Sequence, residues 1–326
     1  MRTKILSMLR QSEGYVSGQQ MCDALHISRT AVWKNINQLK EEGYKIEAQN
    51  KLGYKLTECP DILSRHELES RLSESVMGRK VVYYEETDST NIAARQLDEH
   101  DGLHGTLVVA ERQTAGKGRR GHSWESPQGQ GIWMSLVLRP DILPVKASML
   151  TLVMALAVAQ GIEKVTGIQT QIKWPNDIVA EGKKLCGILT EMSTEMEYIQ
   201  RVVIGVGINV NIKEFPEEIA ATASSLYLLT GKTWGRAVLI QEVMKSFEKW
   251  YNVFMESQDL SGLVQEYEER LVNRGNQVKI IREEADYTGV AKGITPLGEL
   301  IVERADGSLE YVLSGEVSVR GVYGYV

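Results

Sequence analysis

The sequence predicts a multidomain α/β protein in three parts: an N-terminal winged helix-turn-helix, a central α+β domain built on a mixed sheet, and a small C-terminal β-barrel. Apolar residues at helical spacing, followed by two short strands, predict the first part. Apolar strands and long helices fill the middle, and short strands split by glycine-rich turns predict the barrel. The 326 residues leave room for this division, which we place at 1–62, 63–270 and 271–326.

Composition and charge are those of an ordinary soluble protein, with 43% hydrophobic and 25% charged residues. The net charge of −6 is uneven. Residues 1–60 hold nine Lys and Arg against six Asp and Glu, net +3, which leaves −9 for the rest. A basic head on an acidic body indicates a nucleic-acid partner for the head and a different task for the body.

Cysteine and histidine usage argues against disulfides and against a zinc site. Cys22, Cys59 and Cys186 are odd in number and lack metal-ligand spacing, and the five histidines do not cluster. The most apolar stretch, 147–159, is too short to span a bilayer, and the first residues lack the apolar core of a signal peptide. We therefore expect a cytoplasmic protein with free thiols and no membrane partner.

The first 60 residues are typical of a helix-turn-helix followed by a wing. Ser17 and Ser28 are suited to cap the second and third helices, and Gly43 to end the third. The polar side of the third helix and the following hairpin carry groups suited to base edges and phosphates: Arg29, Thr30, Trp33, Lys34, Asn37 and Lys51. The pattern favours DNA binding over the alternative, a three-helix interaction module with a solvated charged face.

A basic, glycine-rich stretch at 111–124 follows a short apolar strand. Gly116, Gly118 and Gly121 alternate there with Lys117, Arg119, Arg120 and His122. Glycines at this density let a backbone approach a ligand closely, and the cations suit a polyphosphate or a carboxylate. The stretch lacks the ending of a Walker loop and the helix of a dinucleotide fingerprint. A solvated basic loop is the alternative.

Further polar groups follow predicted strands elsewhere in the body. Asp88 or Ser89 would cap a helix, leaving N–H groups at its first turn for an anion or a ring carbonyl. A strand that ends near Pro175 carries the side chains of Lys173, Asn176 and Asp177, a set that suits a phosphate and its Mg²⁺. Lys184 falls on the second strand of a hairpin, where an isolated lysine is usually solvated.

Five motifs in this order resemble those of the bifunctional biotin–protein ligases, and the winged head resembles their biotin operon repressor form. The motifs are Glu86-Thr-Asp-Ser-Thr-Asn91, Arg112-Gln-Thr-Ala-Gly-Lys-Gly-Arg119, Lys173-Trp-Pro-Asn-Asp177, Lys184-Leu-Cys-Gly187 and Gly205-Val-Gly-Ile-Asn209. The resemblance implies a central domain similar to class II synthetases and an SH3-like C-terminal barrel.

The resemblance also implies a two-step reaction and a regulatory role. Biotin and ATP, with Mg²⁺, give biotinyl-5′-AMP, and the biotinyl group then passes to a lysine of the biotin carboxyl carrier protein of acetyl-CoA carboxylase. With the adenylate as corepressor, such proteins form homodimers, bind operator DNA and repress genes of biotin synthesis and transport. We expect the dimer interface near 201–205 and at the loop 211–222, which would close over the adenylate.

Site residues follow from the matched motifs. The catalytic residues would be Lys184, Arg119 and Lys117, with Lys184 bridging the biotin carboxyl and the α-phosphate. The biotin site would hold Ser89, Thr90, Asn91, Gln113, Lys117, Gly118, Arg119, Lys184 and Gly187. The ATP site would hold Arg119, Trp124, Lys173, Asn176, Asp177 and Asn209, with Asp177 also near Mg²⁺.

Two positions depart from the family pattern, which more often has arginine at 117 and 122. Lys117 keeps the charge but loses the bidentate fork of arginine, and the role of His122 is open. Two other functions stay open at this point. One is a DNA-binding regulator whose body only senses biotin, and the other is a related ligase for lipoate or octanoate.

Overall fold

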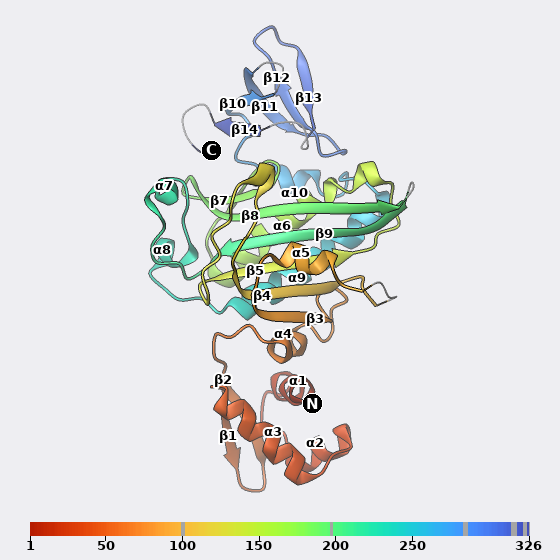
Figure 1. Cartoon of the computed structure of the whole chain (residues 1–326), viewed down its shortest axis with the longest axis vertical. Helices are drawn as coiled ribbons and strands as arrows, with labels where there is room; N and C mark the ends of the chain where they lie inside the picture. The colour runs from red at the N-terminus through yellow and green to blue at the C-terminus, as the bar shows by residue number, and fades with distance from the viewer. Residues whose placement is uncertain (99–101, 196–197, 283–285, 314–317, 322–324, 326) are drawn as a thin grey trace.

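The computed structural model describes residues 1–98, 102–195, 198–282, 286–313, 318–321 and 325. The head, a central domain and a C-terminal domain follow one another along the long axis of the molecule (Figure 1). This arrangement confirms the predicted fold class. The domain boundaries at 62/63 and 270/271 stay a prediction.

The head is a three-helix unit with a two-stranded wing. Its elements are α1 (Arg2–Gln11), α2 (Gly18–Leu25), α3 (Arg29–Glu41), β1 (Lys45–Gln49) and β2 (Gly53–Glu58). Ser17 forms a capping box with Gln20, and the Ser28 side chain accepts from the Ala31 N–H, as the sequence predicted. Gly43 has a φ of +98°, which favours glycine at the end of α3.

A buried carboxylate on α4 (Arg65–Arg71) is one of the groups that join the head to the body. Glu67 is fully buried and accepts hydrogen bonds from Arg10 of α1, from Arg71 Nε at 2.6 Å and from the Tyr44 hydroxyl at 2.6 Å. Burial, followed by the charge of Glu67, raises the pKa of Tyr44, so the phenol stays protonated and keeps donating. The orientation of the head on the body therefore rests on charge-assisted hydrogen bonds.

The central domain is built on a seven-stranded mixed sheet in the order β3-β4-β5-β9-β8-β7-β6. The pair β3–β4 is parallel and the other pairs are antiparallel. The strands are β3 (Val81–Thr87), β4 (Thr106–Gln113), β5 (Gly131–Leu138), β6 (Gln171–Lys173), β7 (Asp177–Ala180), β8 (Lys183–Glu195) and β9 (Tyr198–Asn209).

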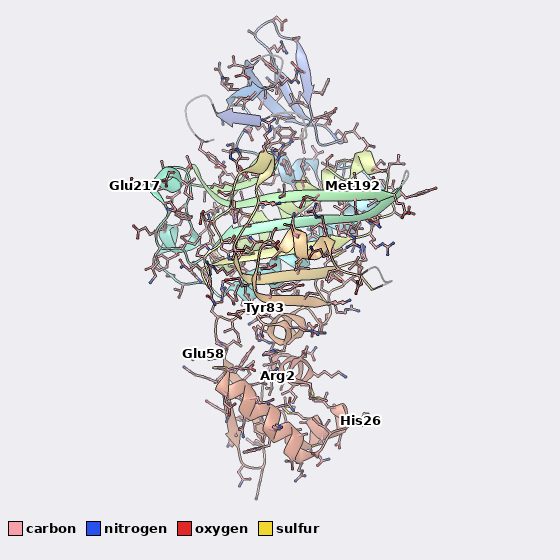
Figure 2. The ribbon with its side chains drawn as sticks, viewed as in Figure 1. Arg2, His26, Glu58, Tyr83, Met192 and Glu217 are labelled. Carbon is pink, nitrogen blue, oxygen red and sulfur yellow. The ribbon has the colours of Figure 1, made fainter. Side chains whose placement is uncertain are left out.

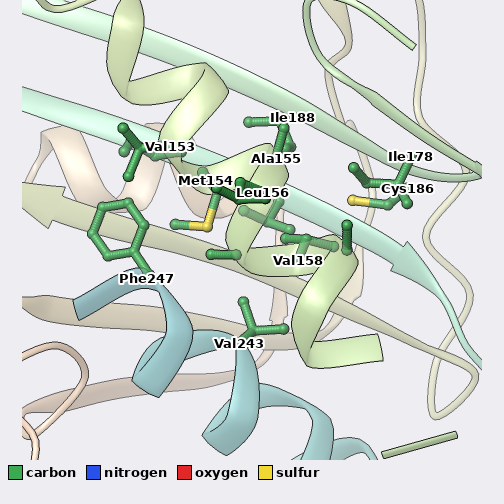
Figure 3. Packing of buried hydrophobic residues seen from close by; sticks show 14 of the residues in the cluster. Val153, Met154, Ala155, Leu156, Val158, Ile178, Cys186, Ile188, Val243 and Phe247 are labelled. Carbon is green, nitrogen blue, oxygen red and sulfur yellow. The ribbon is translucent and has the colours of Figure 1, made fainter. Parts of the chain in front are cut away.

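Helices cover the two faces of this sheet unequally. On one face lie α6 (Met149–Thr166) and α9 (Arg236–Ser257), whose side chains fill the main core (Figure 3). A Cβ on Gly161 would lie 2.7 Å from Val243 Cγ2, so glycine lets these two helices pack closely. On the other face, the part of the chain that the structure describes places the short α5 (Thr90–Arg95) over a smaller apolar cluster. That thinner face has room for polar groups near α5.

The apolar stretch that includes α6 is longer than the sequence suggested. Residues Pro144–Thr166 form one apolar segment of 23 residues, which is long enough by itself to cross a membrane. The statement that the most apolar stretch is too short to span a bilayer was therefore wrong. Its most apolar window is 78% buried in the protein, which is typical of a core helix.

The remaining elements surround the sheet and form the C-terminal domain. Short helices are α7 (Glu217–Ala220), α8 (Leu226–Thr230) and α10 (Val264–Glu268), with 3₁₀ turns at Arg119–Gly121 and Pro144–Lys146. The C-terminal strands are β10 (Gln277–Ile281), β11 (Tyr287–Ile294), β12 (Leu300–Glu303), β13 (Leu309–Val312) and β14 (Ser318–Gly321). They form an antiparallel sheet in the order β13-β12-β11-β10-β14.

Arg236, the first residue of α9, is a buried junction between three segments. It is 2% exposed, and its guanidinium donates to Glu111 of β4 at 2.6 and 3.2 Å and to Asp61 at 3.0 Å. Burial opposes the charge, but hydrogen bonds to Glu111 and the charge of Asp61 outweigh burial and raise the pKa of Arg236. Glu111 also accepts the Leu63 N–H at 3.1 Å, so the segment between head and body is tied to β4.

Replacing Arg236 by methionine should destabilise the central domain, because two carboxylates would lose their buried partner. We expect a loss of about 3–5 kcal/mol, measured as the midpoint shift of the central-domain transition in urea. The matched control is Arg65→Met in an exposed i,i+4 pair with Glu69, which should change stability by about 0.5 kcal/mol or less. Equal shifts of the urea midpoint in the two variants would contradict the stabilising role given to Arg236.

Candidate active site

A network of hydroxyls and amides lies where α5 begins against the sheet. The Thr90 N–H donates to Gln113 Oε1 at 2.8 Å, and the Ser135 hydroxyl contacts Asn91 Oδ1 at 2.6 Å. Asn91 Nδ2 donates in turn to Glu191 at 2.7 Å. Ser89, Thr90, Asn91 and Ser135 are all buried. Side chains held by several bonds each are preorganised to meet a polar ligand.

The cap of α5 differs from the sequence prediction. Ser89 occupies the N-cap position, but its side chain makes no cap hydrogen bond, and the Asp88 carboxylate accepts from the Ser89 N–H instead. Gln113, from the neighbouring strand β4, takes the Thr90 N–H. That N–H is therefore not free, because a side chain 23 residues away satisfies it.

Trp124 lies on a floor made by two glycines. Gly187 of β8 and Gly207 of β9 face each other in register. A Cβ on Gly207 would lie 2.4 Å from Trp124 Nε1, and a Cβ on Gly187 would lie 3.0 Å from the same indole. Trp124 Nε1 is buried and has no hydrogen-bond partner among the described residues. The paired glycines thus leave a flat recess on the sheet that the indole covers.

A cluster of charges borders this recess. Lys184 Nζ lies 2.6 Å from Asp177 Oδ1 and 5.2 Å from the Trp124 ring centroid. Arg119 Nη1 donates to Asn176 Oδ1 at 3.2 Å. Burial lowers the pKa of Arg119, with the charge of Asp177 acting in the opposite direction. Three predicted segments therefore meet here: the basic loop, the β6–β7 turn and the start of β8.

The basic loop folds as a tight hairpin rather than as an open cradle. The Gly118 N–H donates to the His122 carbonyl at 2.7 Å, and the Trp124 N–H donates to the Gly116 carbonyl at 2.9 Å. Lys117 and His122 are exposed. Arg119 contacts the β6–β7 turn through Asn176.

The segment 211–222 is fastened beside Lys184. The Lys184 N–H donates to the Thr222 carbonyl at 2.7 Å, and the Ser224 N–H donates to the Lys184 carbonyl at 2.9 Å. Asn209 Nδ2 donates to the Ser224 carbonyl at 3.1 Å. The predicted closing loop therefore ends beside the charged cluster, and it contains α7.

Some residues of the site were missed from the sequence. Ser135 and Glu191 join the amide network, and Tyr325 contacts Asp177 at 2.6 Å. Ser135 could have been noticed because it is a serine within the apolar strand β5. No sequence pattern pointed to Tyr325. Burial raises the pKa of the Cys186 thiol well above its ordinary value, so this neighbour of Lys184 is not a thiolate nucleophile.

The head presents the predicted DNA-contact residues to solvent. Arg29, Thr30, Trp33, Lys34 and Lys51 are exposed, Asn37 is half-buried, and the Trp33 side chain is 59% exposed. Val32, Ile36 and Leu39 fill the opposite side of α3. One helix thus joins an apolar inner side to a basic, polar outer side.

The dimer interface expected near 201–205 stays a prediction, but these five residues themselves have almost no exposed surface to offer it. All five residues are buried, and β9 pairs with β5 on one side and with β8 on the other. A strand paired along both edges has no free backbone for a second copy. Exposed apolar side chains of the same hairpin lie nearer its tip, at Tyr198 (76%) and Met192 (42%), and Figure 2 shows Met192 at the far end of the sheet.

Comparison with known proteins places this site in a family. Residues 2–55 match the HTH domain, residues 83–209 the biotin/lipoate A/B protein ligase family, and residues 275–320 the biotin protein ligase C terminal domain. The chain is 40% identical over 322 residues to the bifunctional ligase/repressor BirA of Bacillus subtilis, which covers 98% of each chain. It is 30% identical to BirA of Escherichia coli, covering 97% of this chain and 96% of that one.

A solved structure agrees with these matches. A biotin protein ligase from Aquifex aeolicus, in complex with biotin and ATP, aligns with a TM-score of 0.66 and 32% identity. The alignment covers 74% of this chain and 99% of that chain. Fold and site together define a protein ligase with a helix-turn-helix head. The chain belongs to the bifunctional ligase/repressor family of biotin protein ligases.

Replacing Gly207 by alanine should displace Trp124, because the new Cβ would overlap the indole. We expect a weaker affinity for biotin by about tenfold, equal to roughly 1.4 kcal/mol. Isothermal titration with biotin measures this change, and tryptophan fluorescence reports the displacement. Gly14→Ala, at a position with nothing within 4 Å, is the control. An unchanged biotin affinity in Gly207→Ala would show that Gly187 and Gly207 do not position Trp124 for ligand binding.

Proposed function

We propose that the protein joins biotin to ATP to form biotinyl-5′-AMP and pyrophosphate, and then transfers the biotinyl group to a lysine of a biotin carboxyl carrier protein of acetyl-CoA carboxylase. The observation that carries the proposal is the Lys184–Asp177 pair beside the Trp124 recess, with the amide network on the same sheet. Relatives at 40% identity over almost the whole chain support the choice of substrate.

In this proposal the uncharged network binds the uncharged end of biotin. Ser89, Thr90, Asn91 and Gln113 provide hydroxyl and amide groups for the ureido ring, and Ser135 and Glu191 hold Asn91 in place. Lys117, Gly118 and Gly187 would lie along the rest of the molecule. Trp124 covers the paired glycines, so we assign its indole to the wall of the biotin pocket as well as to adenine stacking. The unpartnered Trp124 Nε1 is a donor left for a ligand.

The adenylation step brings two anions together. The biotin carboxylate must attack the α-phosphate of ATP, and pyrophosphate must leave with the electron pair of the broken P–O bond. Lys184 and Arg119 would offset the repulsion and stabilise the charge that develops on the phosphate oxygens. Lys173, Asn176 and Asn209 would line the nucleotide side. The mixed anhydride needs protection from water, which the fastened segment 211–222 is placed to give beside Lys184.

Magnesium would arrive with the nucleotide. Among the described residues, no group of three or more His, Cys, Asp or Glu side chains is placed to hold a metal. Asp177 is a carboxylate that fits an ion held mainly by phosphate oxygens and water, as Mg²⁺ prefers. When bound, the ion would supply positive charge to the phosphates.

Transfer of biotin to the carrier lysine completes the reaction. The lysine amine would attack the biotinyl carbonyl, AMP would leave, and the amine would lose a proton as the amide forms. We also propose a regulatory cycle in the cytoplasm. With biotinyl-5′-AMP bound, the protein would form a homodimer whose two heads bind operator DNA of biotin synthesis or transport genes, with Arg29, Thr30, Trp33, Lys34, Asn37 and Lys51 facing the DNA.

Lys184→Ala should abolish adenylate formation, because the cation that bridges the two anions is lost. We expect kcat for pyrophosphate release to fall by about 10²–10³-fold. The assay contains protein, ATP, Mg²⁺, biotin and a carrier domain. Lys183→Ala, the adjacent exposed lysine, is the matched control and should keep full activity. Absence of carrier biotinylation by the wild-type protein would overturn the proposed function, and activity with lipoate or octanoate in place of biotin would reassign its substrate.

Ligand-dependent dimerisation should be measurable by sedimentation velocity. We expect the mass to rise from monomer to dimer when biotin and ATP are added together. Tyr198→Asp should prevent the rise, since it places a charge at an exposed apolar position of the β8–β9 hairpin. Tyr311→Asp, at an exposed tyrosine of the C-terminal domain, is the control. A wild-type protein with the same mass under both conditions would contradict the regulatory cycle.

A further inference from the structure

Tyr325 is a side chain of the C-terminal domain that reaches the charged cluster of the central domain. Its hydroxyl donates to Asp177 Oδ2 at 2.6 Å. Its ring covers Lys173, whose Nζ lies 3.5 Å from the ring centroid. Both partners belong to the β6–β7 turn, so one tyrosine connects two domains where the nucleotide is proposed to bind.

The two oxygens of the Asp177 carboxylate have different neighbours: Oδ2 accepts a hydrogen bond, whereas Oδ1 makes an ion pair and has no hydrogen-bond partner among the described residues. Lys184 Nζ lies 2.6 Å from Oδ1, and the Tyr325 hydroxyl holds Oδ2. The hydrogen bond from Tyr325 orients the carboxylate, and the charge of the carboxylate attracts the Lys184 ammonium that lies beside its other oxygen. The position of Lys184 therefore depends on Tyr325 through Asp177, although Tyr325 lies 141 positions along the chain from Lys184, as the residue numbers 325 and 184 give.

The ring of Tyr325 has a second and separate effect. Lys173 is only 6% exposed, so its ammonium has lost most of its water. An aromatic face above a poorly hydrated ammonium offsets part of that loss. The ring thus holds Lys173 in place, whereas the hydroxyl holds Asp177.

We propose that Tyr325 is a positioning residue for the adenylation step, setting Lys184 through Asp177 with its hydroxyl and Lys173 with its ring. The inference rests on the proposed function, in which these two lysines meet the phosphates. It makes the C-terminal domain part of the catalytic site, because Tyr325 brings a hydroxyl and an aromatic ring to two residues of the central domain.

The contacts of Tyr325 predict that its substitution affects the nucleotide side of the site more than the biotin side. Tyr325 touches Lys173 and Asp177, which belong to the nucleotide side. The network of Thr90, Asn91 and Gln113 is held by other residues. Changes at Tyr325 should therefore alter the kinetics of ATP and leave the KM for biotin within about twofold.

The test compares Tyr325→Phe and Tyr325→Ala in the full-length protein by pyrophosphate release at varied ATP and varied biotin. Tyr325→Phe loses the hydroxyl and keeps the ring, so kcat/KM for ATP should fall about tenfold. Tyr325→Ala loses both the hydroxyl and the ring, so its kcat/KM for ATP should be about threefold lower than that of Tyr325→Phe. Tyr311→Phe and Tyr311→Ala, at an exposed tyrosine of β13, are the matched controls and should behave as wild type. Thermal midpoints of all four variants identify any that fail to fold.

Three results would overturn the proposal. An unchanged kcat/KM for ATP in Tyr325→Phe would remove the role of the hydroxyl. A lower KM for ATP in that variant would make Tyr325 a competitor of the nucleotide. An equal rise in the KM for ATP and in the KM for biotin would indicate a general structural role. Wild-type protein that released no pyrophosphate would instead count against the proposed function, so the two failures are distinguishable.

Discussion

The buried guanidinium of Arg236 is the interaction that joins the end of the head to the core of the central domain. It pairs with Glu111 at the end of the β4 core and with Asp61 just after the wing. The same Asp61 carboxylate accepts a longer hydrogen bond, 3.4 Å, from Asn211, where the segment 211–222 begins. The connection to the head, the strand that leads into the basic loop and the start of the closing segment thus meet at one charge. Because that charge is out of water, removing any partner is costly, and the three segments hold one relative position.

The site depends on glycines that leave space for other side chains, as well as on hydrogen bonds and ion pairs. Gly187 and Gly207 face each other across β8 and β9 and leave the space that Trp124 covers, and Gly205 leaves the space for Asn91, whose Oδ1 a Cβ would meet at 2.2 Å. Glycines on adjacent strands of one sheet produce a recess without any loop. Polar groups then gather around it from α5, from β4 and from the β6–β7 turn. The sheet supplies rigidity, and the loops supply charge.

Much of the architecture was predictable because it depends on local patterns. Capping serines, the Gly43 terminus and the apolar stripe of α3 identified the helices of the head, since each feature acts within a few residues. The motifs around Lys173 and Lys184 were also visible. Ser89 is the N-cap of α5, as predicted, but its side chain makes no cap hydrogen bond, and Gln113 of β4 accepts the Thr90 N–H that was expected to be free. The burial of residues 201–205 was not predicted, because strand order within the sheet is not visible from a strand's own residues.

By itself, the sequence determined which segments form helices and strands, which family the chain resembles and which residue types carry its charges, because these follow from spacing and composition along the chain. Only the tertiary structure decided which of those residues meet. Lys184 could not be paired with Asp177, nor Asp177 with Tyr325, until the sheet and the C-terminal domain brought them within hydrogen-bond distance. The reason is physical: periodicity acts over a few residues, whereas burial of an ionised group needs partners from wherever the fold can supply them.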